Sequence, residues 1–266
     1  MNLRIVSCMI ILIEILFFTN SSLAIENGKN REITFKNGVV TAIQALNSNA
    51  PFEYYELHLS EIEINTLKSI KINLTEQYCN YGNLKVLNSE VNEFIKSLNF
   101  ENKTTAEAVS QIVVRIVRGV VQGSGQETAW VVLRSFTPTS SYDMPRWHTD
   151  GYYYEPYAGD PYKFAITLKG PPTLFYKLPD EKRGEFYALQ RKGTEQNDYN
   201  RQAIAAFLGN SKEAISVARP HQGAVFVVGS NHAAIHSEPP IKEERLFLSV
   251  LPGSKAQIKE WKDKQE

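Results

Sequence analysis

From about residue 130 onward, the chain is a series of short extended segments separated by turns that contain glycine or proline. Three of these segments are the runs AWVVLRSF, YKFAITLK and AVFVVG, which are rich in the β-branched and aromatic residues that strands favour. Several short strands with this punctuation are typical of an antiparallel sandwich or a small barrel. This half of the chain therefore predicts a β-barrel core, with a polar, helix-forming insertion at about residues 180–212.

The preceding residues, 25–125, have a mixed pattern. The run REITFKNGVVTAI predicts a strand, a turn at Asn37–Gly38, and then a second strand or the start of a helix. Apolar residues at helical spacing predict a helix within SEVNEFIKSLNF, residues 89–100. The clearest helix follows it, with Thr104 or Thr105 as the expected N-cap and the Gly-Ser-Gly stretch at residues 123–125 as its end. The alternative is a strand over its β-branched core, Ile112 to Val121.

These patterns together predict an α+β protein in which an N-terminal mixed α/β extension packs on a C-terminal barrel. The length of 266 residues suits one large domain with such an addition. The expected divisions are a signal peptide at 1–24, the α/β extension at 25–125, the barrel at 126–254 with its insertion at 180–212, and a charged tail at 255–266.

The first 24 residues have the layout of a secretory signal peptide. Arg4 precedes an apolar run from about Ile5 to Phe18, and small residues at Ser22 and Ala24 form the expected cleavage site. We therefore expect export, with the mature chain beginning after Ala24. The apolar run is shorter than the roughly 20 residues that a membrane span needs, so we expect no stable membrane anchor. A buried N-terminal helix is the alternative.

Charge argues against one class of partner. The chain has 29 basic and 29 acidic residues and contains no long basic block, so we expect no nucleic-acid partner. Its two cysteines are Cys8, within the expected signal peptide, and Cys79, so the mature chain has no internal disulfide.

One short motif, PRWHTDG at residues 145–151, suggests a metal site. On an extended strand His148 and Asp150 point to the same face, so an imidazole and a carboxylate approach one point. A third ligand would come from a distant strand that folds back beside them. Among the later histidines we favour His236 as this ligand and place His232 in the surrounding pocket. The alternative is a surface hydrogen bond between His148 and Asp150.

With these residues in view, the segments WHTD, GAVFVVGSNHAAIH and ERLFLSV resemble the non-haem Fe(II)- and 2-oxoglutarate-dependent dioxygenases. The resemblance covers about residues 134–252. It implies a double-stranded β-helix, also called a jelly-roll barrel, as the C-terminal domain. It also implies Fe(II) held by His148, Asp150 and His236, because two imidazoles and one carboxylate occupy one face of a metal and leave other positions open.

The same resemblance implies a site for the co-substrate, 2-oxoglutarate. Arg245 follows His236 by nine residues and is expected to bind the far carboxylate of 2-oxoglutarate through a planar, two-pronged contact. Many members of the family have a serine two residues after this arginine, where this chain has Phe247. Ser249 lies on the same strand face and is the substitute that we expect. The alternative for Arg245 is a salt bridge with a neighbouring glutamate.

Residues near the expected barrel mouth are candidates for a substrate pocket. The run DGYYYEPYAGDPY directly follows the metal motif, and alternate side chains, Tyr152 and Tyr154, are expected to face the cavity. Arg134, on the preceding strand, is expected to point inward and bind an anionic group. The alternative is that the tyrosines pack the loop itself.

Three functions remain open from the sequence. The first is an exported Fe(II)- and 2-oxoglutarate-dependent oxidoreductase that acts on a C–H bond of a small molecule, protein or peptide, although 2-oxoglutarate is scarce outside the cytosol. The second is a cupin-like metal protein that does not use 2-oxoglutarate. The third is a non-catalytic binding module with a tyrosine-rich mouth. Arg245 distinguishes the first function from the second, and metal binding distinguishes both from the third.

Overall fold

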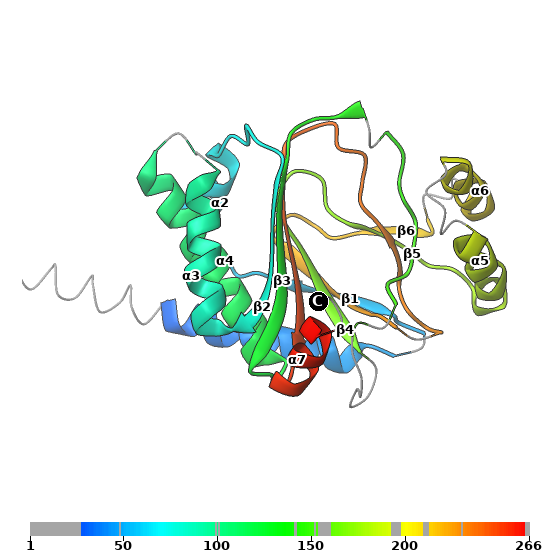
Figure 1. Ribbon diagram of the computed structural model, residues 1–266, viewed down its shortest axis with the longest axis horizontal. Helices are drawn as coiled ribbons and strands as arrows, with labels where there is room; N and C mark the ends of the chain where they lie inside the picture. The colour runs from blue at the N-terminus through cyan, green and yellow to red at the C-terminus, as the bar shows by residue number, and fades with distance from the viewer. Residues whose placement is uncertain are drawn as a thin grey trace, which may run out of the picture.

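The computed structural model describes residues 28–263, apart from residues 48, 99, 101, 141–142, 152, 154–160, 193–197, 210–212 and 230. The expected signal peptide lies outside these residues. The described part is an α+β structure in which helices cover antiparallel sheets (Figure 1). Within it, every helix is too short or too polar to cross a membrane.

The strands form two antiparallel sheets. The larger sheet has six strands in the order β1-β7-β4-β9-β3-β2, and the smaller sheet has three in the order β6-β5-β8. Their bounds are β1 Phe52–Glu56, β2 Glu76–Asn83, β3 Thr128–Phe136, β4 Tyr162–Lys169, β5 Leu174–Tyr176, β6 Ile215–Val217, β7 Gln222–Val227, β8 Ile235–Ser237 and β9 Arg245–Gly253.

Side-chain alternation gives the larger sheet two different faces. On β9, Leu246, Leu248 and Val250 are buried in the main hydrophobic core against the helices. The intervening residues Phe247 and Ser249 point to the opposite face, where they line a cavity between the two sheets. Because successive side chains of a strand point to opposite faces, polar side chains can line the cavity without interrupting the apolar core.

A helical layer packs on the outer face of the larger sheet, on the left in Figure 1. It contains α2 (Glu61–Ser69), α3 (Leu84–Ser97), α4 (Lys103–Gly123) and a helix over residues 28–45. The longest helix, α4, begins at Asn102, whose side chain accepts a hydrogen bond from the backbone of Thr105. Asn102, rather than Thr104 or Thr105, is therefore the N-cap.

The helix over residues 28–45 corrects the expected strand and turn in this region. Phe35, Val39 and Ala42 are buried at helical spacing, whereas Asn37 is exposed and Gly38 is half-buried within the same helix. Gly119 on α4 allows the two helices to approach closely, because an added Cβ atom there would clash with the ring of Phe35. Burial of this apolar stripe outweighs the turn preference of the Asn-Gly pair.

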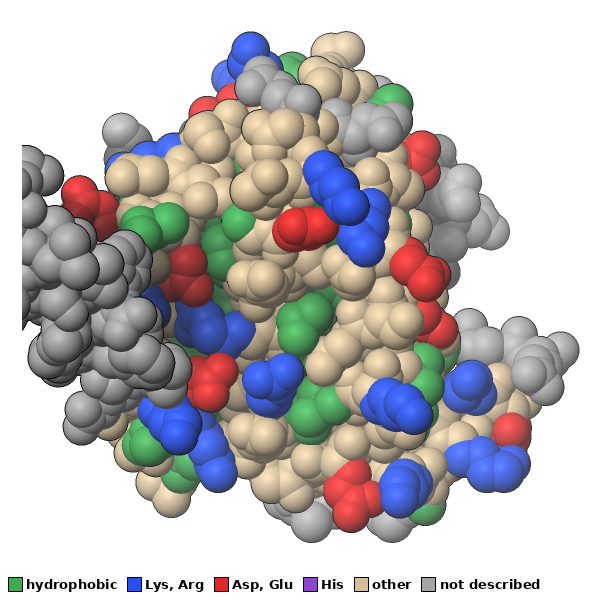
Figure 2. Space-filling model, turned by 90° about the vertical axis from the view of Figure 1, so that its left-hand side faces the viewer, with side chains coloured by type: hydrophobic (Ala, Val, Ile, Leu, Met, Phe, Trp, Pro, Cys, Tyr) green, Lys and Arg blue, Asp and Glu red, His purple; other side chains and the backbone are tan. Residues whose placement is uncertain are grey.

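The outer surface of the helical layer is mixed in charge. Figure 2 views this side directly and shows positive and negative side chains interspersed on it. Ion pairs between neighbouring helices include Arg31 with Glu63 at 3.1 Å and Arg115 with Glu63 at 3.0 Å.

The insertion expected at about 180–212 contains two helices, α5 (Asp180–Lys192) and α6 (Asp198–Leu208), which lie beyond the smaller sheet on the right in Figure 1. Phe186 of α5 packs in one apolar cluster with Tyr176 and Ile235 of that sheet. The C-terminal tail forms α7 (Lys255–Asp263). The N-terminal region also supplies β1 and β2 to the larger sheet, so residue 125 does not separate two independent sheets.

Candidate metal centre

The structure brings His148, Asp150 and His236 together. His148 and Asp150 lie on the segment between β3 and β4, and His236 is the middle residue of β8. The backbones of His148 and His236 exchange two hydrogen bonds of 2.9 Å, so the first segment runs antiparallel to β8 as a continuation of the smaller sheet. The carbonyl of Asp150 accepts a further hydrogen bond of 2.9 Å from the amide of Gly229.

The insertion also holds the metal-binding segment. The side chain of Gln190 on α5 accepts a hydrogen bond of 3.0 Å from the backbone amide of Thr149 and donates one of 3.1 Å to its carbonyl. Thr149 lies between His148 and Asp150, so this side chain fixes the backbone from which both residues project. Helix α5 therefore helps to position the site although it supplies none of the three candidate ligands.

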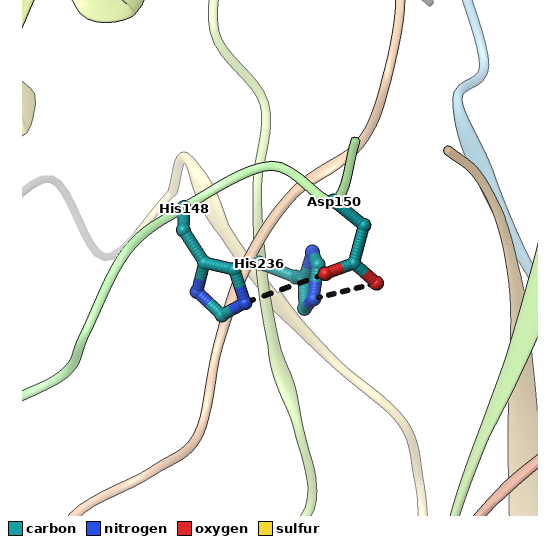
Figure 3. Close-up of side chains that lie close together, drawn as sticks. All are labelled: His148, Asp150 and His236. Carbon is teal, nitrogen blue, oxygen red and sulfur yellow. Dashed lines mark ion pairs between the residues drawn. The ribbon is translucent and has the colours of Figure 1, made fainter. Parts of the chain in front are cut away.

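Figure 3 shows the three side chains pointing toward one another. Nε2 of His148 lies 3.7 Å from Oδ1 of Asp150, and Nε2 of His236 lies 3.8 Å from Oδ2. The candidate ligand atoms of the three residues all lie within 4.8 Å of one another. Among the described residues, this is the group of histidine, cysteine and acidic side chains with a geometry that suits a metal ion.

Hydrogen bonds determine which nitrogen of each imidazole faces the site. Nδ1 of His148 donates to the carbonyl of Arg146 at 2.8 Å, and Nδ1 of His236 donates to the carbonyl of Ala234 at 3.1 Å. A carbonyl only accepts, so the proton of each neutral ring is on Nδ1 and the lone pair is on Nε2. This is the usual outer support of a metal-binding histidine.

The electrostatic environment keeps His236 and Asp150 in the forms that bind metals. Burial, followed by the positive charge of His148, lowers the pKa of His236 to about 4, so its ring is neutral at neutral pH. Burial alone would raise the pKa of Asp150. Electrostatic interactions with His236, Lys163 and His148 outweigh that effect and hold the pKa of Asp150 well below its usual range.

Lys163 is a site residue that the sequence reasoning missed. It lies on β4, and its Nζ donates to Oδ2 of Asp150 at 3.0 Å and to the hydroxyl of Tyr153 at 2.9 Å. The same Nζ lies 5.3 Å from the ring centroid of Trp130 and 5.0 Å from that of Tyr153. A signal was present in the sequence, because strand alternation places Lys163 on the same face as Ala165. Nothing in the sequence indicated that this face meets Asp150.

The three residues open into a cavity of about 220 Å³ between the sheets. This volume is below the roughly 300–1,000 Å³ of typical sites for drug-sized ligands, so it suits a small ligand. Its walls contain both apolar and charged side chains, namely Trp130, Val132, Arg134, His148, Asp150, Tyr153, Lys163, Ala165, Thr173, Phe226, His236, Glu238, Phe247 and Ser249.

The other expected site residues are placed as follows. Arg134 and Ser249 line the cavity. Tyr152 and Tyr154 lie outside the described residues. His232 is exposed and is not part of the cavity wall, because β8 begins only at Ile235 and His232 lies in the turn before it. The spacing of four from His236 therefore does not place the two histidines on one strand face.

Arg245 is fully buried at the start of β9, close to Thr173 of the cavity wall. Its Nε donates to the carbonyl of Pro171 at 2.9 Å, and its Nη2 donates to Oγ1 of Thr173 at 3.2 Å. Its Nη1 is buried and has no hydrogen-bond partner among the described residues. Burial lowers the pKa of Arg245 to about 10, so the side chain is charged at neutral pH.

Glu238 is a second site residue that the sequence reasoning missed, although it follows His236 by two residues on the same face. Its carboxylate lies 3.2 Å from Nη2 of Arg146 and 3.6 Å from Nη1 of Arg134. Burial would raise its pKa, but His148 and Arg146 more than offset this and lower it to about 2. The inward arginine predicted at position 134 is thus partly neutralised.

The arrangement can hold a divalent metal ion on one side. The two neutral imidazoles and one carboxylate form the donor set of non-haem Fe(II) oxygenases, in which the remaining metal positions stay open. The cavity next to them offers Thr173 and Ser249 for an anionic or polar ligand, and Arg245 lies directly behind Thr173, to which it donates a hydrogen bond. The site therefore combines the chemistry for metal binding with the chemistry for binding a small acid.

No protein-family model matches the sequence, and no curated protein matches it. Solved structures that resemble the chain include a prolyl-4-hydroxylase from Pseudomonas putida, which is 11% identical, with 82% of this chain and 99% of that chain covered and a TM-score of 0.36. A prolyl hydroxylase from Trichoplax adhaerens, solved with a peptide of hypoxia inducible factor, is 9% identical, with 90% and 95% covered and a TM-score of 0.39. A viral collagen prolyl hydroxylase from Paramecium Bursaria Chlorella virus-1, solved as a 2OG complex, is 10% identical, with 76% and 95% covered and a TM-score of 0.32.

Proposed function

We propose that the protein is an Fe(II)- and 2-oxoglutarate-dependent oxygenase that oxidises a C–H bond of a small molecule or peptide. One observation carries this proposal: the His148–Asp150–His236 group opens into a cavity whose wall includes Thr173, and Thr173 accepts a hydrogen bond from the buried Arg245. We further propose that the two sheets are the faces of a double-stranded β-helix. The segment of His148 extends the smaller sheet, and both sheets direct side chains into one cavity.

The residues fit the proposed metal ion by their chemistry. His148 and His236 present unprotonated Nε2 atoms, and Asp150 supplies a carboxylate that stays ionised. When bound, Fe(II) together with 2-oxoglutarate supplies the oxidising chemistry. The side chains bind and orient the reactants, and the apolar wall around them limits access of water.

The residues also fit the proposed co-substrate. A guanidinium with a free Nη1 can donate to a carboxylate, and such charge-assisted bonds are about twice as strong as neutral ones. Thr173 already accepts a hydrogen bond from Arg245 and lines the cavity, so a carboxylate there would meet both side chains. Ser249 lies on the adjacent wall and can donate from its hydroxyl.

One observation favours a second candidate, a cupin-like metal protein without 2-oxoglutarate. Arg245 already donates to Pro171 and Thr173, so part of its role is to tie β9 to the segment before β5. If that is its whole role, metal binds at His148 and added keto acid has no effect.

The test uses protein loaded anaerobically with Fe(II) and then titrated with 2-oxoglutarate. We expect stoichiometric metal and a visible charge-transfer band in the wild type, and loss of both in His148→Ala. The matched control is His232→Ala, which removes an exposed histidine and should leave both signals unchanged. Metal binding without the band would favour the cupin-like candidate. Failure of the wild type to bind metal would refute both.

We also propose that the chain is exported after cleavage behind Ala24, on the strength of the signal-like sequence at residues 1–24. N-terminal sequencing of protein recovered outside the cytoplasm should read from Ile25. An intact Met1 on active, cytosolic protein would contradict export and would be consistent with an intracellular supply of 2-oxoglutarate.

A further inference from the structure

Lys163 binds one specific oxygen of the carboxylate ligand. Its Nζ lies 3.0 Å from Oδ2 of Asp150, and both side chains are mostly buried, with exposed fractions of 14% and 12%. A charge-assisted hydrogen bond of this length occupies a lone pair of Oδ2. Oδ1 lies 3.7 Å from Nε2 of His148 and Oδ2 lies 3.8 Å from Nε2 of His236, so the hydrogen bond from Lys163 is what distinguishes the two oxygens and makes Oδ1 the better one for a metal ion.

The ammonium group of Lys163 is itself held in place. Its second hydrogen bond goes to the hydroxyl of Tyr153, and the rings of Tyr153 and Trp130 lie at cation–π distance from it. Trp261 of α7 packs against both rings, at 5.8 Å from Trp130 and 5.4 Å from Tyr153. A long, flexible side chain is thus confined to the position from which it reaches Asp150.

A carboxylate without such a partner can bind a metal with either one or both oxygens. If Asp150 bound with both, it would occupy a coordination position that an external ligand could otherwise use. A simple need to neutralise a buried lysine does not explain why the ammonium contacts a metal-binding carboxylate inside an aromatic enclosure. A role for Lys163 in holding Oδ2 accounts both for its contact with Asp150 and for the aromatic enclosure around its ammonium group.

We propose that Lys163 is a positioning residue of the metal centre that keeps Asp150 a one-oxygen ligand and thereby preserves a coordination position for the co-substrate. The proposal rests on the proposed function of the same site. It assigns no contact with substrate to Lys163, which acts through Asp150. It also gives the aromatic group around Lys163 a role, since Trp130 and Tyr153 hold the ammonium in place.

Three variants test the proposal. Lys163→Met keeps the length of the side chain and removes its charge and donors, whereas Lys163→Arg restores a charged donor. Lys177→Met makes the same chemical change at an exposed lysine outside the metal cavity and serves as the control. Two measurements are made on full-length protein: the number of Asp150 oxygens bonded to Mn(II) in crystals of the loaded protein, and the Kd of 2-oxoglutarate with the Fe(II) form.

In Lys163→Met we expect both oxygens of Asp150 on the metal and a Kd for 2-oxoglutarate about tenfold higher, in the range seen when outer partners of metal ligands are lost. Lys163→Arg should recover most of the affinity, and Lys177→Met should match the wild type. If Lys163→Met does not fold, Tyr153→Phe removes one restraint on the ammonium and should raise the Kd by a smaller factor.

The results separate this proposal from the proposed function. If wild-type protein responds to 2-oxoglutarate and Lys163→Met keeps the same affinity with a single bonded oxygen, Lys163 is only a buried counterion and the proposal is wrong. If the wild type binds metal but gives no keto-acid response, the proposed co-substrate fails first and the proposal for Lys163 falls with it.

Discussion

Replacement of Arg245 by methionine is the sharpest test of the co-substrate site. The guanidinium is fully buried, Nε and Nη2 donate to Pro171 and Thr173, and Nη1 has no partner among the described residues. A carboxylate next to Nη1 would gain a hydrogen bond to a charged group, which contributes about 1.5–3 kcal/mol. A second estimate of the same contact is a Coulomb attraction of about 4 kcal/mol, if the charges lie about 4 Å apart at an effective dielectric constant of about 20.

Part of this gain is offset because the carboxylate of 2-oxoglutarate loses its hydration and is repelled by the carboxylate of Glu238 in the same cavity wall. We therefore expect a net loss of about 3 kcal/mol in Arg245→Met, which raises the Kd of 2-oxoglutarate by about two orders of magnitude. The assay is titration of the Fe(II)-loaded, anaerobic protein, followed by the keto-acid charge-transfer band.

Pyruvate provides the matched control, because it keeps the keto-acid end of 2-oxoglutarate and lacks the distal carboxylate. Its Kd should be nearly the same in the wild type and in Arg245→Met. If the variant binds 2-oxoglutarate as tightly as the wild type does, Arg245 does not contact the co-substrate. If both acids weaken by the same factor, the substitution has disturbed the whole site and the assignment is refuted.

Three further predictions concern stability, measured as the free energy of unfolding in urea. The pKa of His236 falls from 6.5 to about 4 on folding, so the unfolded chain binds the proton more readily. The free energy of unfolding of the metal-free protein should therefore fall by up to about 3 kcal/mol as the pH falls from about 6.5 to 4. The variant His236→Gln should show a flatter pH dependence. Ser60 and Glu63 form a capping box at the start of α2, and Ser60→Ala should cost about 1 kcal/mol, whereas no change would show that the cap is dispensable. Gly119→Ala should destabilise by about 2 kcal/mol, because the clash with Phe35 exceeds the gain in helix propensity; a stabilised variant would contradict the close packing of these helices.

The three candidate metal ligands could be predicted because their spacing in the sequence indicates where their side chains point. His148 and Asp150 lie two apart on an extended segment, and His236 lies within a recognisable strand. Glu238 could have been found by the same alternation from His236. Lys163 could not, because its contact with Asp150 depends on how β4 lies beside the metal-binding segment, and no local pattern encodes that arrangement.

The fold was predicted where periodicity agreed with local preference and was missed where the two disagreed. The apolar positions of α4 indicated a helix of nearly the observed length. In the helix over residues 28–45, the Asn37–Gly38 pair favoured a turn, yet the burial of Phe35 and Val39 decided the outcome. Burial against α4 is a tertiary effect, and a local preference cannot anticipate it.

The position of β1 and β2 determines what a shortened protein would expose. They are the two edge strands of the larger sheet, paired with β7 and β3, and both come from the N-terminal region. A protein shortened to begin at residue 126 would expose the hydrogen-bonding edges of β7 and β3 and uncover the apolar face beneath the helices. Such open edges recruit other chains into mixed sheets, so the shortened protein should aggregate rather than fold as a smaller domain. The N-terminal region thus protects the larger sheet from self-association.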